Sequence, residues 1–172
     1  MVGRMIGLLV ILCTFFTFHC QPSDLLAKAG ADSIGLSDTT GYANPAQIKR
    51  MFRRLHGEIG AEKMAGAHLH NTRGQGLANV LAALEVDVTT FDSSLGGLGG
   101  CPYAPGATGN IVTEDLVFML EAMGLRTGVD VDALIAAREV LLRGLPDETI
   151  YGNVPAVGLP KGFTYAGNKS AT

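Results

Sequence analysis

Two histidines lie two residues apart at positions 68 and 70, within the sequence AHLHNTRG of residues 67–74. Residues two apart on a β-strand point to the same face. Two neutral imidazoles on one face form a ready pair of metal ligands, because imidazole nitrogen binds many divalent ions. The alternative is that His68 and His70 are unrelated polar residues at the end of a strand.

A glycine-rich segment follows at residues 93–110, with the sequence SSLGGLGGCPYAPGATGN. It holds six glycines and one cysteine, Cys101, and it ends in Asn110 just before an expected helix. Two interpretations stay open: a functional loop that carries a thiol, or a flexible surface loop with an incidental cysteine. A nucleotide-binding loop is disfavoured, because Pro102 stands where a dinucleotide fingerprint needs its third glycine and the lysine of a P-loop is missing.

Asp38 comes directly after residues 32–37, a short and mostly apolar segment typical of a strand in a parallel sheet. An aspartate after a strand is usually a turn or cap residue. In barrel enzymes, however, the same position at the carboxyl end of a strand carries the chemistry. Both interpretations of Asp38 stay open on the residues alone.

The elements that must position these residues alternate between strand and helix. The helix from Pro45 has Asn44 as its cap and Gln47 three residues later, and its apolar residues recur at helical spacing. The expected elements are a helix end at 25–31, strands at 32–37, 63–70 and 87–92, and helices at 45–59, 76–84, 113–123 and 130–143, with an irregular segment from 145. This order predicts an α/β fold with a parallel sheet and right-handed crossovers.

Composition bounds the function further. The net charge of −3 predicts no nucleic-acid surface. Three cysteines without framework spacing argue against a disulfide scaffold and favour a reducing compartment. The apolar run at residues 5–18 is too short to span a membrane comfortably, and no small-residue cleavage site follows it. It is a signal or anchor segment, a buried strand or unrelated sequence joined to a gene fragment, and we favour the last.

Four motifs together resemble one enzyme family. They are H-x-H-N-T-R-G, the loop SSLGGLGGCPYA, GNIVTEDL and the late GLPKGF. In this order they are similar to 3-hydroxy-3-methylglutaryl-CoA lyases, over about residues 25–163. The resemblance implies a partial (β/α)8 TIM barrel, about its last three strands with their helices. It divides the chain into an apolar segment of uncertain origin at 1–24, the C-terminal half of a barrel at 25–165 and a tail at 166–172.

The resemblance also implies a reaction: metal-dependent cleavage of 3-hydroxy-3-methylglutaryl-CoA to acetoacetate and acetyl-CoA, as in leucine degradation and ketone body metabolism. The cofactor would be Mg²⁺ or Mn²⁺ and the partner an acyl-CoA. The implied metal ligands are His68, His70 and Asn110, supported from outside the coordination sphere by Glu114. The implied catalytic residues are Cys101 as acid and His68 or Asp38 as base, under a substrate loop that contains Gly97, Gly99 and Gly100.

One departure leaves alternatives open. The family's remaining ligand, an Asp beside an Arg on strand one, has no match in this chain, so activity of the isolated chain is doubtful. The chain could be a non-catalytic half-barrel that pairs with another chain, or it could form a homodimer. A condensing synthase of the isopropylmalate type is less consistent, because its motif continues Asn-Asp where this chain has Asn71-Thr72. The implied location is the cytoplasm, or the mitochondrial matrix in a eukaryote, with a signal or membrane segment still open.

Overall fold

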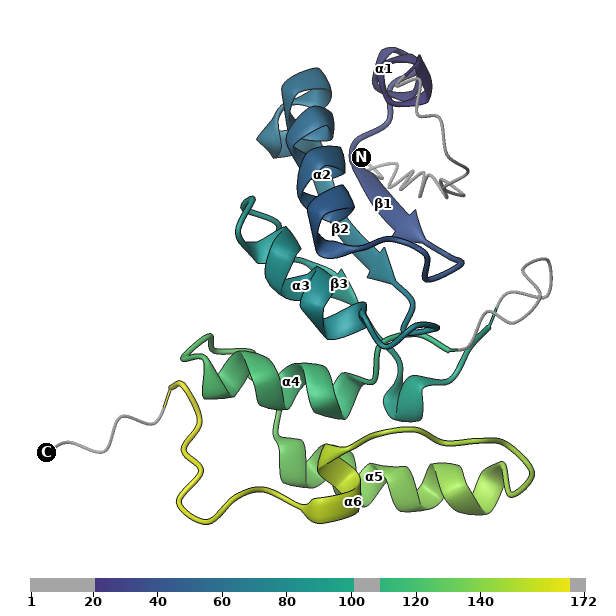
Figure 1. Ribbon diagram of the computed structural model, residues 1–172, viewed down its shortest axis with the longest axis vertical. Coiled ribbons are helices and arrows are strands. Elements are labelled where there is room, and N and C mark those ends of the chain that lie inside the picture. Colours follow the sequence, from purple (N-terminus) through teal and green to yellow (C-terminus); the bar gives the residue numbers. More distant parts are fainter. Residues whose placement is uncertain (1–20, 101–108, 168–172) are drawn as a thin grey trace, which may run out of the picture. The chain divides into compact units, whose positions relative to one another are not determined.

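The computed structural model describes residues 21–100 and 109–167 (Figure 1). The chain divides into two compact units. The first unit holds the described residues up to Asp92, together with Gly100, Gly109 and Asn110. The second unit holds residues 93–99 and the described residues from Ile111 onward. Among the described residues, no helix is both long and apolar enough to cross a membrane.

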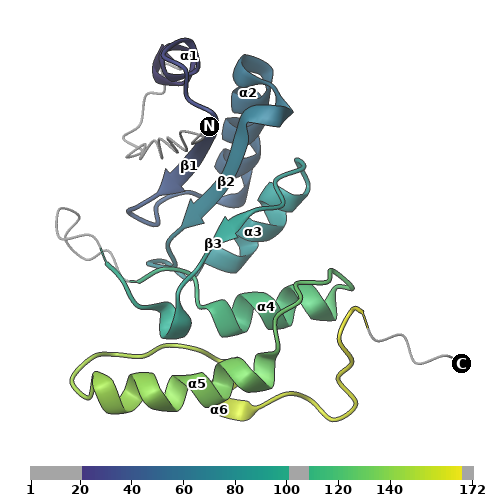
Figure 2. The ribbon, with the colours of Figure 1, turned by 180° about the vertical axis from the view of Figure 1, so that it is seen from behind.

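The first unit is a parallel α/β layer structure, as the sequence predicts. Its three strands, β1 (Ile34–Asp38), β2 (Met64–Leu69) and β3 (Phe91–Asp92), pair side by side in that order. Helices α2 (Pro45–Ile59) and α3 (Gly76–Leu84) connect them and cover one face of the sheet, and Figure 2 shows the sheet from behind. A short helix, α1 (Gln21–Lys28), precedes β1.

Helix α2 begins where its capping sequence requires. The Asn44 side chain accepts a hydrogen bond from the Gln47 backbone N–H, and the Gln47 side chain accepts one from the Asn44 N–H, both at 3.0 Å. Pro45 fills the first turn, where the missing N–H has no intrahelical partner to lose. The apolar face of α2 is buried, and fully burying one such side chain stabilises the fold by about 1.5–3 kcal/mol. The buried residues of α2 are Ile48, Phe52, Leu55 and Ile59.

The strand register places three polar residues in one row. Ser37 of β1 pairs with His68 of β2, which in turn pairs with Asp92 of β3. Directly paired residues point to the same face of a sheet, so all three share a face. Ala67 and Leu69, which alternate with His68, lie on the other face and are buried. The row therefore belongs to the face opposite the buried apolar one.

The second unit is helical in its described part. It contains a short turn, η2 (Leu95–Gly97), followed by α4 (Thr113–Ala122), α5 (Val131–Gly144) and α6 (Val154–Val157). Its core joins one buried valine from each of the three helices. An aromatic series, Phe118, Phe163 and Tyr165, packs the late segment onto this core at ring-centroid distances of 5.2 and 5.3 Å.

Most elements lie within about two residues of their predicted ranges, but one strand is much shorter, and the segment from 145, predicted to be irregular, contains the short helix α6. The third strand was predicted at 87–92 but covers only Phe91–Asp92. Asp87 adopts a left-handed φ of 66°, which ends the preceding turn and is incompatible with an extended strand. Helix α4 begins at Thr113, as predicted, and the Thr113 hydroxyl lies 2.8 Å from the Ser93 hydroxyl. Asp130 caps the start of α5, since its carboxylate accepts a hydrogen bond from the Ala133 N–H at 3.0 Å.

Candidate active site

The histidine pair converges at the end of β2. His68 is the fifth residue of the strand and His70 follows its last residue. Their Nε2 atoms lie 3.2 Å apart, and the rings meet edge to face at a centroid distance of 5.1 Å. The prediction that both imidazoles face the same space is therefore confirmed.

The separation of the two nitrogens fits a shared ion. Neighbouring ligands bound at about 2.0–2.2 Å to one octahedral or tetrahedral ion lie about 2.8–3.6 Å from each other. The observed 3.2 Å falls within that range. Imidazole nitrogens, together with the amide oxygen that the family resemblance adds, also suit Mn²⁺ or Mg²⁺ better than a thiolate set would.

Asn110 is brought to the pair by backbone pairing. Residues His70 and Asn110 form an antiparallel bridge, and the Asn71 N–H donates to the Gly109 carbonyl at 3.2 Å. The segment after the glycine loop thus runs alongside the residues that follow β2. Within the described ranges, no group of three His, Cys, Asp or Glu residues could hold an ion. The family resemblance implies Asn110 as the third ligand, and that role remains a prediction.

The surroundings of His68 disfavour its charged form, chiefly through burial. Burial lowers the pKa of His68 below the usual 6.5, and the neighbouring His70 lowers it further. Asp92 opposes these effects, with its Oδ2 at 3.5 Å from His68 Nδ1. A neutral imidazole retains a lone pair, which is the form that binds metal ions.

Asp38 is buried at the end of β1, with 2% of its surface exposed. Its two carboxylate oxygens accept hydrogen bonds from the Tyr42 and Ala43 N–H groups, each at 3.0 Å. The side chain therefore caps its own turn, which is the ordinary role of an aspartate after a strand. Each oxygen keeps a second lone pair, so these bonds are compatible with the predicted role as a base, which stays a prediction.

Arg73 lies within the histidine motif, but no sequence pattern predicts a role for it. Its guanidinium stacks over the Tyr42 ring at 3.9 Å and donates to the Thr40 and Gly41 carbonyls at 3.3 and 3.4 Å. It thereby ties the loop after β2 to the loop after β1. Gly41 has a φ of 62°, and a Cβ there would lie 2.7 Å from Thr72. The two loops can approach this closely only because position 41 is glycine.

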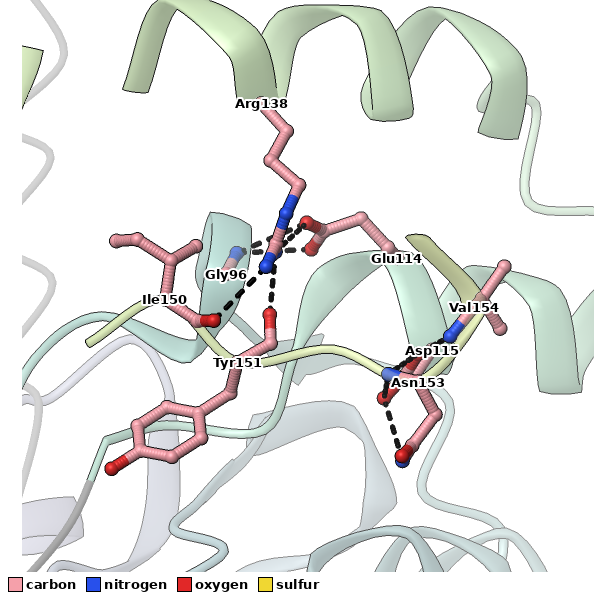
Figure 3. A network of polar contacts seen from close by, with 8 residues as sticks. All are labelled: Gly96, Glu114, Asp115, Arg138, Ile150, Tyr151, Asn153 and Val154. Atoms are coloured by element: carbon pink, nitrogen blue, oxygen red, sulfur yellow. Dashed lines mark hydrogen bonds and ion pairs between the residues drawn. The ribbon is translucent and has the colours of Figure 1, made fainter. Parts of the chain in front are cut away.

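Glu114 lies in the second unit and is fully buried, and Figure 3 shows its polar contacts. Its carboxylate accepts from the Gly96 N–H at 3.0 and 3.2 Å and from Arg138 Nη1 at 3.1 Å. Arg138 also donates to the carbonyls of Ile150 and Tyr151. Glu114 therefore supports the start of the glycine loop directly. Its predicted support of the metal ligands remains a prediction.

The adjacent Asp115 holds the segment before α6. Its carboxylate accepts hydrogen bonds from the backbone N–H groups of Asn153, at 3.0 Å, and of Val154, at 2.7 Å (Figure 3).

In the predicted substrate loop, Gly97 and Gly99 have left-handed φ values of 67° and 104°, which favour glycine. Cys101 lies outside the described residues. Its catalytic role, like the closure of the loop over a substrate, remains a prediction.

The chain is similar to known lyases over most of its length. The HMGL-like family model matches residues 16–141. A hydroxymethylglutaryl-CoA lyase of Bacillus subtilis is 47% identical over 115 residues, which are 67% of this chain and 38% of that protein. An (R)-citramalyl-CoA lyase of Chloroflexus aurantiacus is 48% identical over 112 residues, which are 65% of this chain and 35% of that protein. Other relatives are cytoplasmic and mitochondrial hydroxymethylglutaryl-CoA lyases.

The fold agrees with a solved HMG-CoA lyase from Acinetobacter baumannii, in complex with coenzyme A and 3-methylmalate. The two chains superpose with a TM-score of 0.76 at 46% identity, covering 83% of this chain and 46% of that one. The strands and helices of this chain thus correspond to part of a TIM barrel, as predicted. The chain spans less than half the length of these relatives.

Proposed function

Because the chain belongs to the HMGL-like family, we propose that it forms the metal-binding half of a carbon–carbon lyase that cleaves 3-hydroxy-3-methylglutaryl-CoA. The observation that carries this proposal is the convergence of His68 and His70 Nε2 at 3.2 Å at the carboxyl end of a parallel strand. This is the edge at which barrel enzymes place their chemistry. The proposed products are acetoacetate and acetyl-CoA.

We propose His68, His70 and Asn110 as the residues that hold the ion. A divalent ion bound there supplies Lewis acidity, which makes the substrate hydroxyl easier to deprotonate. Mn²⁺ and Mg²⁺ both fit the donor set, and the choice between them rests on the family alone. The remaining coordination positions would be filled by substrate, water or groups from outside this chain.

The bond changes follow from the substrate. A base removes the proton of the tertiary hydroxyl, the C–O electrons form a ketone, and the adjacent carbon–carbon bond breaks. Its electron pair goes to the acetyl-CoA fragment as an enolate, which a general acid then protonates. A ring nitrogen that binds an ion has no lone pair for a proton, so His68 as ligand leaves Asp38 as the candidate base. Cys101 is the candidate acid, since a thiol donates a proton more readily than an alcohol.

The metal-binding step can be tested on the full 172-residue chain without any turnover. Titration with Mn²⁺, followed by electron paramagnetic resonance, should show one site that is lost in the double variant His68→Ala/His70→Ala. The matched control is His56→Ala, a histidine on α2 outside the pair. Equal Mn²⁺ binding by the wild type and the double variant would refute the proposed site.

A second substrate is supported by the Chloroflexus relative, a citramalyl-CoA lyase by name, whose 48% identity is close to the 47% of the Bacillus subtilis hydroxymethylglutaryl-CoA lyase. The alternative function is therefore cleavage of a citramalyl-type acyl-CoA. The two functions differ in the ketone product, so product analysis with both thioesters separates them. We propose an acyl-CoA substrate in either case. The family resemblance alone supports a homodimer or a pairing chain. It also supports a cytoplasmic or mitochondrial location.

A further inference from the structure

His68 lies between two polar neighbours in the row across the sheet. Its pairing partner in β1 is Ser37, and its pairing partner in β3 is Asp92. The Ser37 hydroxyl is buried and makes no hydrogen bond within the described part of the chain. Asp92 is instead 60% exposed at its side chain, yet its Oδ2 lies 3.5 Å from His68 Nδ1. The Asp92 carboxylate is thus the group of β3 that lies next to the His68 imidazole.

The two nitrogens of the His68 ring have different partners. Nδ1 faces the Asp92 carboxylate, and Nε2 faces His70 Nε2 at 3.2 Å. A carboxylate only accepts hydrogen bonds, so it favours the tautomer with the proton on Nδ1. In that tautomer the lone pair is on Nε2, the atom that faces His70.

We propose that Asp92 is a positioning residue that holds His68 in the Nδ1–H tautomer and so presents Nε2 to the site. The histidine ligands of metal sites commonly donate their second N–H to a carboxylate, which fixes both the tautomer and the ring orientation. Nothing in the sequence pattern marks Asp92 for this, because it precedes the glycine loop and lies 24 residues from His68. The metal-related part of this inference rests on the proposed function, whereas the tautomer does not.

A consequence for His70 follows in the absence of an ion. If His68 Nε2 carries a lone pair, the 3.2 Å contact requires the proton to be on His70 Nε2. His70 Nε2 could act as a metal ligand only after giving up that proton. The two histidines therefore differ before an ion binds. His68 Nε2 already has a free lone pair, whereas His70 Nε2 carries a proton.

A purely structural role for Asp92 would mean that its replacement lowers the stability of the fold. We expect no such loss, because the Asp92 side chain is largely exposed and exposed ion pairs contribute little to stability, typically below about 1 kcal/mol. Asp92→Ala should therefore leave the thermal midpoint of unfolding nearly unchanged. The matched control is Asp32→Ala, which removes the same charge from another exposed aspartate of the same unit.

The decisive measurement is nitrogen NMR of the histidine-labelled, metal-free full chain at about pH 8, where an ordinary imidazole with a pKa of ~6.5 is neutral. We expect His68 to be in the Nδ1–H form in the wild type and in Asp32→Ala, and to shift toward the Nε2–H form in Asp92→Ala. An Nε2–H His68 in the wild type, or an unchanged tautomer in Asp92→Ala, would overturn the inference.

Mn²⁺ titration of the same variants supplies the second readout. Loss of a supporting carboxylate typically weakens metal binding by about 10–100-fold, so we expect Asp92→Ala to bind in that range and Asp32→Ala to match the wild type. Equal affinities for Asp92→Ala and wild type would contradict the positioning role. If no variant binds Mn²⁺, the proposed function fails, while the tautomer measurement still decides whether Asp92 orients His68.

Discussion

A single imidazole, that of His68, contacts different groups through its two nitrogens. Asp92 lies at Nδ1 and His70 at Nε2, so the orientation of one ring determines which atom is available to a ligand. Burial and the second histidine lower the pKa of His68 and keep it neutral where an exposed histidine would begin to charge. The protonation state and the tautomer of His68 therefore together determine which ring nitrogen can bind a ligand.

The lowered pKa of His68 predicts how stability depends on pH. The unfolded chain binds a proton on His68 as the pH falls below the usual 6.5, whereas the folded chain resists it until the lower folded pKa. Folding stability contributed by this residue is thus fully present above about pH 6.5 and is lost as the pH falls to the folded pKa. Urea unfolding at about pH 7.5 and 5.5 should show that His68→Gln removes this part of the pH dependence.

The control for this effect is His56→Gln, which replaces a histidine outside the pair. That variant should keep the wild-type pH dependence of the free energy of unfolding. An identical pH dependence in wild type and His68→Gln would show that the environment of His68 does not disfavour its charged form.

Among the elements of the second unit, the contacts are centred on the buried carboxylate of Glu114. Glu114 is fully buried, and its compensation comes from Arg138 of α5 and from the Gly96 N–H (Figure 3). Removing one partner of a buried pair leaves the other charge uncompensated, at a cost of about 3–5 kcal/mol. We expect Arg138→Leu to lower the free energy of unfolding toward that range, measured by chemical denaturation.

Arg143→Leu is the matched control, because it makes the same substitution on the exposed surface of the same helix. Its effect should stay within about 0.5 kcal/mol, as for most surface substitutions. Equal effects of the two variants would mean that the Arg138 contacts do not stabilise the second unit.

Local patterns predicted the elements well and the contacts between them poorly. The start of α2 and the shared face of His68 and His70 follow from rules that act within a few residues, and both are confirmed. The length of β3 does not, because Asp87 takes a left-handed conformation that only the surrounding turn requires. The sequence also gave no signal for Arg138, whose partner Glu114 lies 24 residues away.

The same limit applies to the loops around the site. Arg73 contacts Thr40 and Gly41 across more than thirty residues, so no periodicity within either segment encodes the contact. The position of Arg73 inside the histidine motif was the only available hint. For Asp38, the sequence left a turn cap and a catalytic carboxylate open, and the structure shows the cap while the catalytic role stays a prediction.

At the scale of the whole molecule, the described residues hold part of a barrel and part of a site. The chain covers 38% of the Bacillus subtilis lyase and 46% of the Acinetobacter baumannii structure. The family's strand-one Asp and Arg, which the resemblance requires for metal binding and charge stabilisation, have no counterpart in this sequence. We therefore expect the isolated chain to release little or no acetyl-CoA from 3-hydroxy-3-methylglutaryl-CoA, whatever its affinity for Mn²⁺.

A chimera tests whether the missing strands are what limits activity. Joining the N-terminal part of the Bacillus subtilis lyase to residues 25–163 of this chain should supply the Arg-Asp strand that the family resemblance implies. We expect the chimera to be active, and Cys101→Ser in it to lower turnover by about 10²–10⁴-fold, the usual contribution of a positioned acid. Substrate affinity should change little, because the proposed ligands are untouched and serine is nearly isosteric with cysteine. A thiol that only packs in the glycine loop predicts turnover within a few-fold of the unsubstituted chimera, so turnover and affinity measured on both proteins decide the role of Cys101.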